Sequence, residues 1–327
     1  MLKLGTYGFV RFNLSMFPEA ALRAAPFMAV LATIGIIYGA IVSYAQPDAK
    51  KLVAFSSVSH LGFVMLGLFA LNPQGIQGAI LQMINHGLST GALFLLVGVI
   101  YERRHTRELA QFGGLWKVMP VYGAVMLVVA LSSMGLPGLN GFIGEFTILL
   151  GAWGAGEAGG SYGSYWYAAL SAAGVILAAI YMLWMYQRMF LGEVTNEKNK
   201  SLKDLDKREI ATMVPILILI FWIGLYPRPF FDLMSPSVNQ LVQTLQAAAV
   251  GDFESPKAEQ FYVNVLRRMT PEQKWLAACE LWQMAVETSR ARVRADHPDW
   301  PEAYVRAEIA RRILEAHGTA RLPVPRH

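Results

Sequence analysis

The chain has 327 residues, of which 54% are hydrophobic and 16% charged, and its formal net charge is +5. Soluble domains carry about 25% charged residues, and here the charges concentrate in residues 252–327 while apolar runs fill residues 26–226. The single cysteine, Cys279, excludes an intrachain disulfide and a multi-cysteine iron–sulfur or zinc cluster within this chain. The composition predicts an all-α membrane protein with a soluble tail. The sequence has no stripe of basic residues, so we do not expect nucleic acid as a partner.

Six segments are apolar enough to cross a lipid bilayer, because a spanning helix needs about 20 mostly apolar residues. In chain order they are Pro26–Gln46, Leu52–Leu71, Ile76–Tyr101, Val121–Trp153, Trp166–Gln187 and Ile210–Tyr226. A seventh segment, Met1–Phe17, resembles the end of a helix and is interrupted by Lys3 and Arg11. No small-residue cleavage site follows a clean apolar core there, which argues against a secretory signal.

The loops between these segments alternate between basic and non-basic. Lys and Arg concentrate in residues 47–51, 102–117 and 188–208, whereas residues 72–74 and 154–164 carry only one charge between them. Since cytoplasmic loops carry the excess of Lys and Arg, we expect a multi-pass protein of the cell inner (plasma) membrane with its basic loops in the cytoplasm. If each predicted span crosses the membrane once, the chain after Tyr226 lies on the side opposite the basic loops.

The tail, residues 252–327, is predicted to be a small soluble helical module. A Thr cap at Thr270, followed by Pro and Glu, predicts a helix to about Ala295. A second helix is predicted to begin at the Asp-Trp-Pro-Glu sequence from Asp299 and to end before Gly318. Their apolar positions can form a helical hairpin. These positions are Leu276, Cys279, Trp282, Met284, Val286, Val305, Ile309, Ile313 and Leu314. We interpret the tail as a docking or interaction module whose partner the sequence does not identify.

Four ionisable residues fall within the predicted spans: Lys3, His60, His86 and Glu145. Such groups cost about 2.5 kcal/mol or more at bilayer depth and commonly mark ion pathways. Glu145 has apolar neighbours in the sequence, and burial of this kind lets a carboxyl group exchange a proton near neutral pH. The alternative is a purely structural hydrogen bond to a neighbouring helix.

A helix break is predicted just before Glu145, in the sequence MGLPGLNG of residues 134–141. Pro137 removes a backbone donor, and three glycines within seven residues weaken the helix further. Backbone groups freed at membrane depth must be buried in protein or face a wet cavity, and transporters place such breaks beside ion sites. The break, two turns from Glu145, therefore favours an ion site over a simple packing kink.

The two histidines differ in their sequence surroundings. His86 lies among polar residues at helical spacing, which predicts a water-bearing stripe, and imidazole can pass protons near neutral pH. These polar residues are Gln82, Asn85, Ser89 and Thr90. His60 follows a serine-rich turn, which alone can hydrogen-bond it. Lys3 is either a buried lysine that can lose its proton when desolvated or a solvated terminal charge, and the sequence alone favours the second.

Signatures of cofactor chemistry are absent from the sequence. There is no GxGxxG following a strand, no P-loop and no His/Cys metal-ligand spacing. We therefore expect no cofactor, nucleotide or metal to be bound by this chain.

Three strings of the sequence carry a resemblance to a known family. They are SYAQPDAKKLVAFSSVSHLGFVMLGLF, QGAILQMINHGLSTGALFLLVGVIYERRHTRELAQFGGLW and GLPGLNGFIGEF. They resemble the proton-translocating, antiporter-type subunits of NADH–quinone oxidoreductase, specifically the M type, and the resemblance covers about residues 1–250. It implies two inverted bundles, each with one broken helix, of which residues 1–251 contain the second. Met1 is then expected to be an internal methionine of a longer protein.

The family resemblance also implies roles for the four buried ionisable residues. Lys3 corresponds to the bridging lysine between the two bundles, His60 and His86 to the central polar axis, and Glu145 to the terminal acid on the second broken helix. Together they imply a proton relay coupled to electron transfer elsewhere in the complex, with no redox chemistry in this chain. The implied partners are the lipid bilayer and the other membrane subunits of the complex.

Two alternative functions stay open. One is a cation/proton antiporter or membrane-hydrogenase subunit of the same fold. The other is a non-conducting fragment or fusion whose tail, which resembles short standalone helical bacterial proteins, binds a partner.

Overall fold

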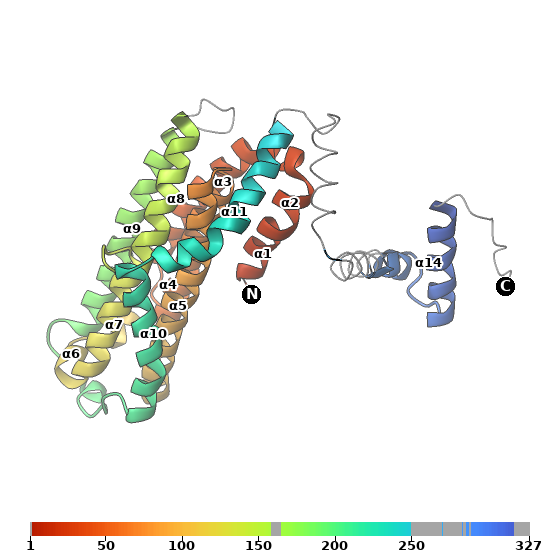
Figure 1. Cartoon of the computed structure of the whole chain (residues 1–327). Coiled ribbons are helices and arrows are strands. Elements are labelled where there is room, and N and C mark those ends of the chain that lie inside the picture. The colour runs from red at the N-terminus through yellow and green to blue at the C-terminus, as the bar shows by residue number, and fades with distance from the viewer. Residues whose placement is uncertain are drawn as a thin grey trace. The chain divides into compact units, whose positions relative to one another are not determined.

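The computed structural model describes residues 2–157, 165–249, 270, 283, 286–287 and 289–316. By its contacts the chain divides into two compact units, Met1–Gly251 and Asp252–His327. The larger unit is a bundle of long helices (Figure 1). The predicted all-α transmembrane bundle with one broken helix is confirmed, and the chain is a multi-pass membrane protein.

Among the described residues, five helices are long and apolar enough to cross a membrane. They are α3 (Pro18–Tyr44), α4 (Ala49–Leu68), α5 (Pro73–Arg104), α9 (Tyr165–Phe190) and α10 (Lys207–Leu225). Before them lies a helical segment of α1 (Leu2–Gly8), a π-helical turn at Phe9–Asn13 and α2 (Leu14–Met16). The predicted start of the first span at Pro26 is wrong, because Pro18 occupies the first turn of α3 and Pro26 lies inside it.

Side-chain caps explain where several spans begin. The Asp48 carboxylate accepts hydrogen bonds from the backbone N–H groups of Lys50 and Lys51 at the start of α4. Asn72 caps α5 in the same way, with a proline at the first helical position. These caps satisfy backbone donors that lack intrahelical partners, so the short polar loops set the ends of the long apolar helices.

The predicted span Val121–Trp153 is in fact two helices, α7 (Pro120–Ser133) and α8 (Asn140–Glu157), separated by the break at residues 134–139. Gly135 and Gly138 in the break have φ angles of +77° and +92°. Glycine adopts these values without the strain that a Cβ atom brings. The break is therefore encoded by its glycines.

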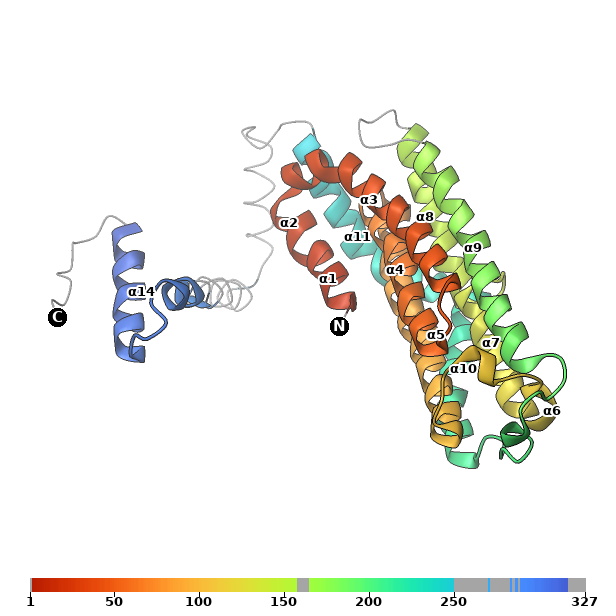
Figure 2. The ribbon, with the colours of Figure 1, turned by 180° about the vertical axis from the view of Figure 1, so that it is seen from behind.

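Helix α11 (Arg228–Ala249) was not among the helices predicted from the sequence, although its residues fall within the predicted membrane domain 1–251. Figures 1 and 2 show α11 beside α2 and α3 in both views. Val238, Val242 and Leu245 are buried against residues of α2, α3, α4 and α5, while Asn239 and Gln240 are exposed. An amphipathic helix has no continuous apolar run, so a search for apolar runs does not find it.

The three basic loops meet at one end of the bundle. Arg107 Nε lies 3.4 Å from an Asp48 carboxylate oxygen, and Lys117 Nζ lies 2.5 Å from a Glu193 oxygen. The hydrogen bond from Lys117, with its positive charge, lowers the pKa of the exposed Glu193 carboxyl. These contacts join residues 47–51 to 102–117 and the latter to 188–208, as expected for three loops on the same side of a membrane.

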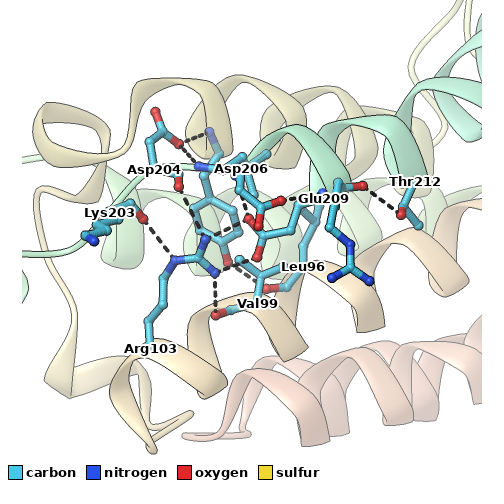
Figure 3. A network of polar contacts seen from close by, with 11 residues as sticks. Leu96, Val99, Arg103, Lys203, Asp204, Asp206, Glu209 and Thr212 are labelled. Atoms are coloured by element: carbon cyan, nitrogen blue, oxygen red, sulfur yellow. Dashed lines mark hydrogen bonds and ion pairs between the residues drawn. The ribbon is translucent and has the colours of Figure 1, made fainter.

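One polar network ties that end of the bundle together (Figure 3). Arg103 of α5 donates to both carboxylate oxygens of Glu209 of α10, each at 2.7 Å, and to the backbone carbonyls of Lys203 and Asp204. The Asp204 carboxylate in turn accepts from two backbone N–H groups at the start of α7. The 188–208 loop is thereby fixed to α5, α7 and α10.

The smaller unit contains a helix over residues 289–296 and α14 (Glu302–Ala316). Val293, Val305 and Ile309 are buried together, with Trp300 packed against them. The predicted second helix is confirmed as α14, and Val293 was not among the predicted apolar positions. Most of the predicted first helix lies outside the described residues.

Acidification is expected to weaken the packing of these two helices. Glu302 accepts hydrogen bonds from Arg290 and Arg294, which lower its pKa to about 2. A carboxyl whose pKa is lower when folded stabilises the fold above its unfolded value, about 4.3, and that contribution is lost as the pH falls toward about 2. Hydrogen-exchange protection of residues 302–316, corrected for intrinsic rates, should fall over that range. In Glu302→Gln this protection should be lower at pH 7 and should change less as the pH falls. Identical pH profiles for the variant and the unchanged protein would contradict the role of the Glu302 carboxylate.

Candidate functional site

Glu145 forms the centre of a buried polar site where three helices meet. It lies on α8 directly after the break, and only 2% of its surface is exposed. Its Oε1 atom is 2.9 Å from His60 Nδ1 on α4 and accepts a hydrogen bond from Gln82 Nε2 on α5 at 3.0 Å. The carboxyl group is therefore paired with an imidazole across the helix interface.

Two glycines make this close approach possible. A Cβ atom at Gly144, next to Glu145, would collide with the Gln82 side-chain oxygen. A Cβ atom at Gly135, in the break, would lie 2.8 Å from Glu145 Oε2. Residue 144 thus lets the α5 amides reach the carboxyl group, and residue 135 leaves space for its second oxygen.

His86 lies one turn beyond Gln82 on α5 and faces His60. The two ring centroids are 5.3 Å apart, and both side chains are buried. His60 Nε2 and both ring nitrogens of His86 have no hydrogen-bond partner among the described residues. A small cavity between them leaves about 10 Å³ for the centre of a water molecule, which is about the room that one water needs. The space is polar and suited to a water that connects the two rings.

The two sides of the break are tied to α5 through Asn140. Ser132, at the end of α7, donates to the Asn140 side-chain oxygen, and Ser89 of α5 lies 2.7 Å from Ser132. Asn85 donates to the Asn140 backbone carbonyl at 2.7 Å. The predicted polar stripe on α5 is confirmed as a buried lining. Ser132 and Asn140 were not among the site residues predicted from the sequence, although an Asn inside a Gly/Pro break is a usable signal.

Lys3 is the predicted site residue that no hydrogen bond or ion pair joins to the other three within the described part of the chain. It lies partly buried on α1, where the Thr6 hydroxyl approaches Met83 Sδ of α5 at 2.8 Å. Met83 is three residues before His86, so α1 passes close to the axis. Among the described residues, no hydrogen bond or ion pair connects the Lys3 ammonium to His60, His86 or Glu145.

The alternative that the neighbouring serines hold His60 is wrong. The hydroxyls of Ser56 and Ser57 lie at hydrogen-bonding distance from the backbone carbonyl of Val53, one turn back on α4. The His60 ring bonds Glu145 instead. At 2.9 Å, an imidazole and a carboxyl group can pass one proton in either direction, which is the chemistry that this site can perform.

A multi-pass helical bundle with a broken helix beside a buried carboxyl–imidazole pair is the arrangement found at the ion sites of membrane transport proteins. Residues 1–171 match the family model described as "NADH:quinone oxidoreductase/Mrp antiporter, TM". The chain belongs to this family. Residues 267–323, in the tail, match a second model, described as "Rv0078B-related antitoxin".

Curated relatives include subunits of respiratory enzymes. The chain is 45% identical over 247 residues to NADH-quinone oxidoreductase subunit M of Rhodobacter capsulatus, covering 76% of this chain and 47% of that protein. It is 44% identical over 243 residues to NADH-ubiquinone oxidoreductase chain 4 of Marchantia polymorpha, covering 74% and 48%. The chain thus spans about half the length of the curated relatives it matches.

Solved structures of membrane complexes are also similar to this chain. A chain of respiratory complex I from Thermus thermophilus with bound NADH aligns with a TM-score of 0.69 at 34% identity, covering 74% of this chain and 50% of that one. A chain of the Mrp complex from Dietzia sp. DQ12-45-1b aligns with a TM-score of 0.63 at 21% identity, covering 74% and 53%. The second likeness shows a common fold.

Proposed function

We propose that residues 1–251 are part of a proton-translocating membrane subunit of a respiratory NADH–quinone oxidoreductase, of the M type. The observation that carries this proposal is the buried Glu145 carboxyl group, paired with His60 at 2.9 Å beside a broken helix. The similarity to subunit M of Rhodobacter capsulatus supports it. The proposed partners are the other membrane subunits of such a complex, and electron transfer takes place elsewhere in the complex.

In this proposal the proton moves between Glu145, His60 and His86, with Lys3 as the next site beyond them. The geometry supports direct transfer between Glu145 and His60, and transfer through one water between His60 and His86. Charges at neighbouring sites interact strongly in a low-dielectric interior. A proton gained at one site therefore favours proton loss at the next. In this proposal, coupling to electron transfer elsewhere in the complex sets the direction of proton movement.

Glu145→Gln tests the proposal in the complex that contains the chain. The amide keeps the size and one acceptor of the carboxyl group but cannot carry a proton, so NADH-driven proton uptake by inverted membranes should fall about tenfold or more. Assembly of the complex should be retained. Glu102→Gln, an exposed carboxyl at the end of α5, is the matched control. An unchanged ratio of protons to electrons in Glu145→Gln would refute the role of Glu145.

Sodium-driven proton exchange without NADH oxidation would instead indicate the antiporter alternative.

For the tail we propose a separate function, binding of a toxin protein. The match of residues 267–323 to the antitoxin model supports this, together with the two-helix packing around Val293 and Val305. Cells that carry a toxin gene paired with an antitoxin of this family should grow when they produce the chain. They should stop growing when they produce a variant that ends at Gly251. Equal growth arrest with equal amounts of both proteins would refute the proposal.

A further inference from the structure

An open cavity of about 610 Å³ lies at the end of the bundle where the basic loops meet. Four cationic side chains and two carboxylates line it, from the end of α5 and the loop that leads to α10. These are Arg103, Arg104, Lys198, Lys203, Asp204 and Asp206. Figure 3 shows the part of this lining around Arg103, Lys203, Asp204 and Asp206. The cavity lies outside the buried proton site and plays no part in the proposed relay.

The carboxylates of this lining are already engaged. Asp204 accepts from the backbone N–H groups of Val121, Tyr122 and Leu205. Asp206 caps α10 through the backbone N–H of Glu209. Backbone donors at the starts of α7 and α10 favour these negative charges, and neither carboxylate forms an ion pair with a basic side chain of the cavity within the described residues.

Three of the four cations have no carboxylate partner. Arg103 is paired with Glu209, but among the described residues Arg104, Lys198 and Lys203 form no ion pair. The neighbouring Lys200, by contrast, pairs with Glu197 at 2.6 Å. Counted together with Glu209, the four cations and two carboxylates of the lining leave one positive charge in excess. The three unpaired cations repel each other, and an anion placed among them relieves that repulsion.

The walls of the cavity are held in place before any ligand arrives. Arg104 Nε donates at 2.6 Å to the side-chain oxygen of Asn199, which is fully buried, and Asn199 Nδ2 donates to the Gln111 carbonyl at 3.1 Å. Arg103 holds the backbone of the segment that carries Lys203. Preorganised walls reduce the ordering cost of binding, so this is a built site rather than a loose patch of lysines.

The position of the cavity indicates the source of the anion. It lies at the ends of the spanning helices α5 and α10, at the depth where phospholipid headgroups lie. Alongside it, α10 exposes large apolar side chains on which an acyl chain can lie. These are Val214, Ile218, Phe221 and Trp222. We propose that the cavity binds a phosphate group, supplied by the headgroup of an anionic phospholipid.

Lipid retention by the chain in its membrane complex tests this site. The complex is equilibrated with phosphatidylglycerol or phosphatidylcholine, washed with detergent, and its bound lipid quantified by mass spectrometry. Lys198→Gln/Lys203→Gln removes two exposed ammonium groups that form no hydrogen bond or ion pair with any residue the structure describes, and should weaken phosphatidylglycerol retention about tenfold. Lys50→Gln/Lys51→Gln is the matched control, because it removes two exposed lysines at the same end of the bundle that do not line the cavity.

The outcomes separate the sources of the anion. Loss of phosphatidylglycerol in the first variant only, without displacement by millimolar inorganic phosphate, supports the lipid headgroup. If inorganic phosphate at the same concentration as phosphatidylglycerol displaces the lipid, the cavity is a phosphate site, but the lipid is not the source of the anion. Equal retention in both variants, or equal retention of phosphatidylglycerol and phosphatidylcholine, overturns the proposal.

Discussion

Gly135→Ala is expected to reduce NADH-driven proton uptake by ten- to a hundredfold, while Gly138→Ala leaves most of it intact. Both glycines lie in the helix break with positive φ angles, so each substitution brings a similar backbone strain, about 1–2 kcal/mol. Only the Cβ atom at residue 135 meets Glu145, at 2.8 Å from Oε2, whereas the Cβ atom at residue 138 has its nearest neighbour at 4.0 Å, in Leu225.

This pair of variants separates strain from displacement of the carboxyl group. A shift of about 1 Å at a proton-transfer site can lower the rate by on the order of a hundredfold, and the Glu145–His60 bond has little room to adjust in a packed interior. Thermal unfolding of the assembled complex and proton uptake should be measured for both variants. Similar unfolding temperatures with very different uptake are expected. Equal uptake in the two would show that the position of Glu145 is not critical.

The spans of this protein could be predicted because they depend on local composition. Apolar runs of sufficient length located α4, α5, α9 and α10 to within a few residues. The break before Glu145 was equally local, since Pro137 and three glycines lie within one short stretch. The search for apolar runs did not find helix α11, because its apolar residues recur at helical spacing among polar ones.

The partners of Glu145 could not be predicted from the residues alone, because they are far away in the sequence. His60 and Gln82 precede Glu145 by 85 and 63 positions, and their approach depends on which helix faces meet. Two glycines permit this contact: Gly135 was predicted only to weaken the helix, and Gly144 was not singled out in the sequence. Their function follows only from what a Cβ atom would touch. Lys3 shows the opposite case: the family resemblance assigns it a role, and among the described residues no hydrogen bond or ion pair joins it to the other three site residues.

Replacing both members of the buried pair by leucine is expected to separate stability from function. In the single variant His60→Leu, Glu145 loses its imidazole partner inside the protein, and removal of one partner of a buried pair destabilises by about 3–5 kcal/mol. In His60→Leu/Glu145→Leu no buried carboxyl group is left, and apolar side chains of similar size fill the space. Most of the lost stability should return, although Gln82 loses its acceptor.

Proton uptake should stay absent in the double variant, because neither leucine can hold a proton. The experiment is a double-mutant cycle of His60→Leu, Glu145→Leu and both together, with unfolding temperature and NADH-driven proton uptake measured for each. Additive losses of stability would mean that the two side chains are not coupled, contrary to their 2.9 Å contact. Proton uptake by a stable double variant would place the pathway elsewhere in the bundle. A stable but inactive double variant would show that the pair is kept for proton transfer, since an apolar pair supports the fold as well.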